Sequence, residues 1–237
     1  MFNIYLRKNG WINPETGAWT MDRIKAVLNG AGPARWLFYG DSITHGAKHT
    51  CGMRDFTEHF RERVLWELHR KNDLVLNSAY SGFTAADLLR DFEWRAAAFR
   101  PTVAFVMTGT NDSVQKRNLS PEAFARQLDE LLDRFESIGC LTVLQTPVPV
   151  LRDLDPTRSG LPRIADAIRQ TAARRNVPLI DHFAIWSSEP AEFYLHADEL
   201  HPNSLGHVKI AHDIFKALDI FEPRTSWVCR IFVPDAR

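Results

Sequence analysis

The sequence predicts an α/β protein in which helices cover both faces of a mostly parallel, five-stranded sheet. Short apolar runs alternate with longer amphipathic segments along most of the 237 residues. Apolar strands of this kind are typical of a parallel sheet, because its crossover helices bury both of its faces. These observations favour a three-layer α/β/α sandwich.

Five apolar runs are the candidate strands. In chain order they span 36–39, 74–77, 102–107, 141–145 and 177–180. The first of them, Trp36 to Tyr39, stops at the small polar turn Gly40-Asp41-Ser42-Ile43. After this turn we expect a helix only beyond a further loop.

Amphipathic segments between these runs are expected to be helical. They span 55–71, 85–99 with a break near Asp91, 121–138, 161–176 and 204–218. The helix over 121–138 has the clearest boundaries, with Ser120 as its N-cap, Pro121 at its first position and Gly139 at its end.

The chain shows no linker or repeat that would divide it, so residues 1–237 are expected to form a single domain. Residues 1–33 would be an N-terminal extension with a short ribbon and a helix around Asp22 to Leu28. Residues 219–237 would be a C-terminal tail, serving as an edge strand or as a contact surface on the domain or between copies. The sequence leaves the oligomeric state open, with a homo-oligomer as one alternative.

Composition excludes several classes of partner. Lys plus Arg and Asp plus Glu are both 29, so no net basic field favours nucleic acid. No apolar run is long enough to span a membrane. The N-terminus has no signal-peptide pattern, and the three cysteines are odd in number and widely spaced, which predicts reduced thiols and a cytoplasmic location.

Polar residues that can carry chemistry follow three of the predicted strands and precede the last helix. Because the carboxyl ends of parallel strands share one edge of the sheet, these segments would converge on one crevice. Among them are a serine at 42, an aspartate at 198 and a histidine at 201. These residue types are the parts of an activated oxygen nucleophile.

Four short blocks resemble those of the SGNH hydrolases, the GDSL-type esterases and lipases, and occur in the family's order. They are Gly40-Asp41-Ser42-Ile43-Thr44, the glycine of Ser81-Gly82-Phe83-Thr84, Gly109-Thr110-Asn111-Asp112, and Asp198-Glu199-Leu200-His201-Pro202. The resemblance runs from about Trp36 to Leu218. It implies a flavodoxin-like SGNH hydrolase fold and a serine esterase that uses an acyl-enzyme intermediate and no cofactor.

By this resemblance, Ser42 is the nucleophile, His201 its base and Asp198 the partner that orients the base. The Ser42 amide, the Gly82 amide and the Asn111 side chain would form the oxyanion hole. These roles agree with the chemistry, since a serine hydroxyl needs an imidazole to take its proton and the imidazole needs an acceptor on its other nitrogen. Asp41 is expected to hold the turn around Ser42 by hydrogen bonds.

Each of these residues has a simpler interpretation when taken alone. Ser42 and Gly82 are common turn residues, and Asn111 could cap a loop. His45 and His49, which follow Ser42, are interpreted as exposed loop histidines. Trp186 precedes the last block, and packing is favoured for it over a place at the mouth of the crevice.

The sequence favours short acyl groups, and acetyl esters in particular, on a small-molecule or carbohydrate alcohol. The alternatives within the family are a lysophospholipase, a thioesterase or an acyltransferase, and a non-catalytic acyl-binding module is a further one. A metal-dependent hydrolase built on His196, Asp198 and His201 is an alternative of another class. It is disfavoured, because the chain has no HExxH motif and no paired CxxC, and no metal or cofactor is expected.

Overall fold

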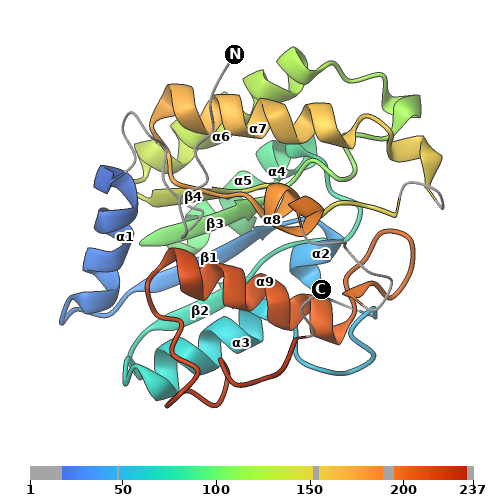
Figure 1. The fold of residues 1–237 in the computed structure, drawn as a ribbon. Helices are drawn as coiled ribbons and strands as arrows, with labels where there is room; N and C mark the ends of the chain where they lie inside the picture. The colour runs from blue at the N-terminus through green and yellow to red at the C-terminus, as the bar shows by residue number, and fades with distance from the viewer. Residues whose placement is uncertain (1–17, 47, 152–154, 189–194, 234–237) are drawn as a thin grey trace.

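The structure, a computed structural model, describes residues 18–46, 48–151, 155–188 and 195–233 (Figure 1). Its centre is a sheet of five strands in the order β2-β1-β3-β4-β5. The strands are β1 (Arg35–Gly40), β2 (Leu74–Asn77), β3 (Val103–Met107), β4 (Leu141–Gln145) and β5 (Leu179–Ile180). All four pairings between them are parallel, which confirms the predicted sheet.

Helices cover both faces of this sheet (Figure 1). The α-helices are α1 (Ala18–Asn29), α2 (Ser42–His45), α3 (Phe56–Glu62), α4 (Ala85–Arg90), α5 (Phe92–Arg95), α6 (Pro121–Ser137), α7 (Leu161–Arg175), α8 (His182–Ser188) and α9 (Ser204–Ala217). The single-turn helices are a π-turn at Arg63–Glu67 and 3₁₀ turns at Ala97–Phe99, Gln115–Arg117 and Pro156–Arg158. The three-layer α/β/α sandwich is therefore confirmed.

Successive side chains of β1 point to opposite faces of the sheet, so the hydrophobic core has two layers. Trp36 and Phe38 belong to the cluster that includes α1, α3 and α9, whereas Leu37 and Tyr39 belong to the cluster of α4, α6 and α7. Phe38 stacks on Phe105 of β3 with ring centroids 4.9 Å apart. Full burial of each such side chain contributes about 1.5–3 kcal/mol to the stability of the fold. The strands are therefore held firmly, and so are the polar segments at their carboxyl ends.

One expected loop is absent, because α2 begins directly at Ser42. Asp41 is the N-cap, and its Oδ1 accepts a hydrogen bond from the Ile43 amide at 3.0 Å. Gly46 ends the helix in the left-handed region with φ 69°. The Asp41 side chain thus caps α2 directly at Ser42, and the helix starts earlier than the sequence pattern indicated.

The helix expected over 55–71 is also shorter. It passes into the π-turn at Arg63–Glu67 and ends there, and His69 adopts φ 57°. The π-turn binds the C-terminal tail, since Glu67 accepts hydrogen bonds from the Ser226 hydroxyl and the Val228 amide. The Arg63 guanidinium donates to the Ile220 carbonyl.

Other boundaries differ less. The strand expected over 177–180 is paired only at Leu179–Ile180, and the helix around Asp22 to Leu28 extends over Ala18–Asn29. Residues 219–233 contain no strand, so the described part of the tail adds no edge strand to the sheet. The ribbon expected before the first helix lies outside the described residues. None of the helices described here has both the length and the apolar character needed to cross a bilayer.

Candidate active site

Ser42 lies at the carboxyl end of β1, as the first residue of α2. The segment after β2 is fastened beside it, because the Tyr80 amide donates to the Gly40 carbonyl at 3.0 Å. The first amides of a helix have no partner within the helix, and their N–H groups point outward at its N-terminal end. The Ser42 amide is one of these, so a hydroxyl and a backbone donor lie at the same point of the sheet edge.

Asp198 and His201 come from the loop before α9, and a local turn fixes their relation. Asp198 Oδ1 accepts hydrogen bonds from the amides of Leu200 at 2.9 Å and His201 at 2.6 Å. The turn thereby holds the carboxylate against its imidazole, with Asp198 Oδ2 and His201 Nδ1 2.9 Å apart. The other ring nitrogen, His201 Nε2, lies 2.9 Å from Ser42 Oγ. The structure thus brings the three residues together in the order Ser42, His201, Asp198.

Asp198 is ionised at neutral pH. Burial alone would raise the pKa of its carboxyl group, but hydrogen bonds from the His201 amide, the His201 ring and the Leu200 amide lower it to about 2. A carboxylate opposite Nδ1 keeps a proton on that nitrogen and leaves Nε2 to accept one from Ser42.

Gly82 and Asn111 lie on the segments that follow β2 and β3. Gly82 adopts φ 86°, and a Cβ at this residue would meet no atom within 4 Å, so its backbone faces open space. Asn111 Nδ2 donates one hydrogen bond to the Phe83 carbonyl at 2.9 Å. An amide nitrogen carries two hydrogens, so a second one is available to another acceptor.

Two buried carboxyl groups support these segments. Burial raises the pKa of Asp41 to about 7, with a further contribution from nearby Asp112. Burial likewise raises the pKa of Asp112 to about 6, although the Ala85 amide donates to it at 3.0 Å. Asp112 therefore ties the segment after β3 to the start of α4, next to Phe83.

Two histidines after Ser42 belong to the site, contrary to the sequence interpretation. His45 ends α2 rather than lying in a loop, and its Nδ1 lies 3.0 Å from Ser81 Oγ, beside Gly82. His49 stacks on His201 with ring centroids 3.6 Å apart. The only sequence signal was their position three and seven residues after the serine, which does not tell a site residue from an exposed one.

His196 does not join Asp198 and His201 as the metal alternative required. Its Nε2 lies 3.1 Å from the Pro149 carbonyl, and its ring packs against Trp186. In the described part of the chain, the group with ligand atoms within 4.8 Å of one another is instead His49, Asp198 and His201. The two rings of that group are parallel within 5°, so their lone pairs do not converge on one point. Trp186 is fully buried, which confirms its packing role.

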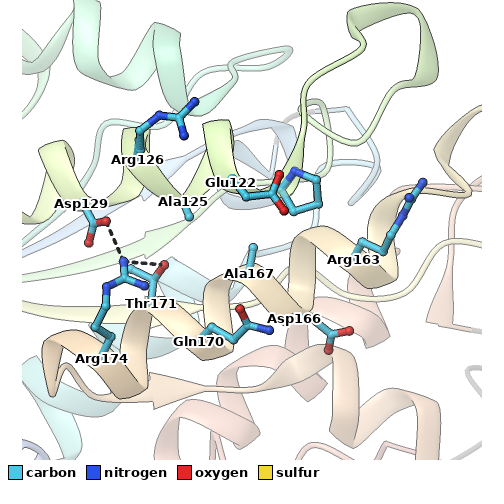
Figure 2. Close-up of a pocket in the computed structure, with 11 residues that line it drawn as sticks. Glu122, Ala125, Arg126, Asp129, Arg163, Asp166, Ala167, Gln170, Thr171 and Arg174 are labelled. Carbon is cyan, nitrogen blue, oxygen red and sulfur yellow. Dashed lines mark hydrogen bonds and ion pairs between the residues drawn. The ribbon is translucent and has the colours of Figure 1, made fainter.

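A groove of about 500 Å³ lies elsewhere, between α6 and α7 (Figure 2). Its walls carry charged side chains, among them Arg126, Asp129, Arg163 and Arg174. None of the residues that line it belongs to the Ser42 site.

Solved structures share this fold. LAE5, an α/β hydrolase enzyme from the metagenome of Lake Arreo in Spain, is 22% identical, with a TM-score of 0.70 over 82% of this chain and 99% of its own. Axe2 of Geobacillus stearothermophilus, an acetyl-xylooligosaccharide esterase, is 22% identical, with a TM-score of 0.66 over 78% of this chain and 94% of its own. At these identities the likeness shows the fold.

Two sequence comparisons complete the picture. An uncharacterised protein of Mycoplasma pneumoniae is 30% identical over 128 residues, which are 53% of this chain and 14% of that relative. This chain therefore spans only a small part of the relative's length. The GDSL-like lipase/acylhydrolase family matches residues 38–209, which include Ser42, Gly82, Asn111, Asp198 and His201. Because this match covers most of the chain, the protein belongs to the GDSL-like lipase/acylhydrolase family.

Proposed function

We propose that this protein is a serine esterase that hydrolyses short-chain acyl esters, acetyl esters above all, with residues 1–237 acting as one domain. The observation that carries the proposal is the imidazole of His201, which lies 2.9 Å from Ser42 Oγ on one side and 2.9 Å from Asp198 Oδ2 on the other. This is the arrangement in which a serine hydroxyl can lose its proton as it attacks a carbonyl carbon.

In the first half of the reaction, Ser42 Oγ bonds to the ester carbonyl carbon while His201 Nε2 takes the hydroxyl proton. Asp198 keeps the proton on Nδ1 and stabilises the imidazolium. When the tetrahedral intermediate collapses, the alcohol leaves with the proton from Nε2, and the acyl group stays on Ser42. Water then attacks the acyl-enzyme by the same route and releases the carboxylic acid.

The negative charge of the intermediate would be met by the Ser42 amide, the Gly82 amide and the second hydrogen of the Asn111 side chain. Asn111 is already held by the Phe83 carbonyl, so it needs no reorganisation when charge develops. Each such preorganised donor contributes on the order of 3 kcal/mol to lowering the barrier.

The solved relatives support both the residues and the substrate class. Three Axe2 structures are catalytic mutants of a serine, an aspartate and a histidine, and in that chain the aspartate and histidine lie three residues apart, as Asp198 and His201 do here. A further neighbour is an acetyl xylan esterase that is 18% identical, with a TM-score of 0.68. Acetyl groups on a carbohydrate are therefore the substrates that we propose first.

The test is hydrolysis of p-nitrophenyl acetate, butyrate and octanoate and of acetylated xylo-oligosaccharides by the wild type and by Ser42→Ala. We expect Ser42→Ala to lose on the order of 10⁴-fold or more in kcat, and the wild-type rate to fall with acyl length and to be unchanged by EDTA. Ser137→Ala, on the exposed end of α6, is the matched control and should behave as the wild type.

Equal turnover by Ser42→Ala and the wild type would contradict the assignment of the nucleophile. A rate that rises from acetate to octanoate would leave the nucleophile in place but overturn the short-chain preference. Release of no acetate from the oligosaccharides, with good turnover of p-nitrophenyl acetate, would overturn the carbohydrate substrate alone.

A further inference from the structure

His49 contacts both His201 and Asp198, the two residues that would activate Ser42. Its ring lies parallel to that of His201, within 5° and with centroids 3.6 Å apart. Its Nδ1 is 3.4 Å from Asp198 Oδ2, the oxygen that also faces His201 Nδ1 at 2.9 Å. At 3.4 Å the contact with Asp198 is longer than a good hydrogen bond, so the ring stack is the tighter of the two interactions.

This stack covers a part of the site that water would otherwise reach. The Asp198 side chain is 34% exposed, whereas those of His201 and His49 are each 16% exposed. The hydrogen bonds of the His201 ring to Asp198 and Ser42 define its plane, but each of them alone leaves the ring room to rock about its last side-chain bond. A flat group against the face of that ring limits this rotation.

The loop between α2 and α3 is shaped to deliver His49 to this position. Lys48 and Cys51 on either side of it adopt left-handed backbone angles, with φ 71° and 52°. Non-glycine residues seldom take such angles, and where they do the surrounding structure must hold them. Gly46 supplies the closure, because a Cβ there would lie 2.4 Å from the Asp55 Cβ.

We propose that His49 is a positioning residue of the esterase: its ring stacks on His201 and holds the imidazole in the plane in which Nε2 faces Ser42. The proposal rests on the proposed function, since it assigns His49 a role through His201. His49 itself contacts neither the acyl group nor the reacting atoms.

The charge state of His49 suits this role. Burial and the neighbouring His201 lower the pKa of His49, while Asp198 acts in the opposite direction. A neutral ring can remain stacked when His201 becomes an imidazolium, and its π face attracts that cation. Because the imidazolium exists in the transition state and not in the resting enzyme, the stack should act on kcat rather than on KM.

The experiment compares His49→Phe, which keeps a flat ring, with His49→Leu, which fills a similar volume without one. Cys51→Ser, in the same loop, controls for disturbance of the backbone, and Ser42→Ala sets the background rate. With p-nitrophenyl acetate we expect His49→Leu to lower kcat about tenfold with KM within about twofold. His49→Phe should lose less than about threefold, and Cys51→Ser should match the wild type.

The melting temperature of each variant, and the rate at which a phosphonate ester labels Ser42, separate the outcomes. Slower labelling by folded His49→Leu, restored in His49→Phe, supports the positioning role. Equal kcat in the Leu and Phe variants, whether both are fast or both slow, overturns it. If Ser42→Ala retains activity, the proposed function itself fails, which is a different result from a failure at His49.

Discussion

Among the described residues, two hydrogen-bonded histidine–aspartate pairs lie at the carboxyl edge of the sheet, and only one of them has the partners of a catalytic site. His201 joins Asp198 to Ser42, with both distances at 2.9 Å. His182, at the start of α8, joins Asp213 Oδ2 at 3.2 Å to Gln145 Oε1 at 3.0 Å. The two imidazoles have the same local geometry, so the geometry of the pair does not by itself define a catalytic base.

What differs is the third partner and the access of water. His182 and Asp213 are fully buried, and Asp213 also accepts a hydrogen bond from the Trp186 indole at 3.1 Å. Gln145 ends β4 and offers an amide, which cannot be activated as a nucleophile. The pair at His201 instead faces a hydroxyl and lies partly exposed. We infer that the buried pair is a structural link between β4, α8 and α9.

The buried pair also gives the orientation of the Gln145 amide. Among the described residues, Gln145 Nε2 is buried with no hydrogen-bond partner, while Oε1 faces an imidazole nitrogen. Exchanging the two amide atoms would let the amide nitrogen donate to His182 Nε2 and the ring Nδ1–H donate to Asp213.

The largest expected effect distinguishes the pairs by activity. Asp198→Asn should lower kcat on the order of 10⁴-fold, because an amide in place of the carboxylate no longer holds the proton on His201 Nδ1. The melting temperature should change little, since Asp198 is one-third exposed and Asn can still accept the turn hydrogen bonds. Steady-state kinetics with p-nitrophenyl acetate and a thermal melt give the two values.

If Asp198→Asn lowered the stability as much as a substitution in the core does, Asp198 would have a structural role like that of Asp213. Retention of more than about a tenth of the wild-type kcat would show that the carboxylate does not orient the base.

The second expected effect distinguishes the two histidine–aspartate pairs by their contribution to stability. Asp213→Ala should lower the free energy of unfolding by about 3–5 kcal/mol, because it removes the buried carboxylate that accepts from His182 and Trp186 and that pairs with the Lys209 ammonium 3.9 Å away. Its hydrogen bond to His182, with Lys209 nearby, keeps the pKa of Asp213 below its usual range even though burial would raise it. Urea unfolding gives the free energy, and kcat of the folded fraction should stay near that of the wild type.

Asp213→Asn is the matched variant and should cost less, about 1–3 kcal/mol, since the amide oxygen can still accept from His182. If either variant keeps full stability, the buried pair is not a structural link. If a folded variant loses kcat while its stability is unchanged, the pair acts on catalysis, and the comparison between the two pairs breaks down.

The sheet could be predicted from the sequence because apolar runs are local signals. Ser42, Asp198 and His201 could be named for the same reason, since each lies in a short block of the sequence. The apolar runs gave the strands within one or two residues, and Ser120, Pro121 and Gly139 marked the ends of α6. The early start of α2 was missed because Asp41 was interpreted as a turn residue, whereas its side chain caps a helix. The π-turn at Arg63–Glu67 was missed since hydrophobic periodicity does not tell it from an α-helix.

The contacts of His49 and His182 could not be predicted, because they join segments far apart in the chain. His49 meets His201 only after the loop between α2 and α3 closes, and His182 meets Asp213 only when α8 packs on α9. Nothing within a few residues of either histidine distinguishes it from the other. The metal alternative names His196 rather than His49 for the same reason. His196 is close to Asp198 and His201 in the sequence, whereas His49 is close to them only in space.

Asp41 is a buried acid to which no described histidine ring donates a hydrogen bond, and its effect should be smaller than that of Asp213→Ala. Burial raises its pKa to about 7 from an ordinary value near 3.8, so the folded state holds a proton that the unfolded state has released. The stability that this proton contributes is complete below about pH 4 and is lost as the pH rises through 7.

Asp41→Asn keeps the oxygen that caps α2 and cannot titrate. Between pH 5 and pH 8 the wild type should therefore lose about 2–3 kcal/mol more unfolding free energy than Asp41→Asn, as measured by urea denaturation at both pH values. Asp112 titrates with the same sign in both proteins, and because its charge raises the pKa of Asp41, the difference between the two proteins reports Asp41 together with this coupling. An equal pH dependence of the two proteins would mean that Asp41 is ionised in the folded state, and its buried charge would then need a partner, as Asp213 has in His182.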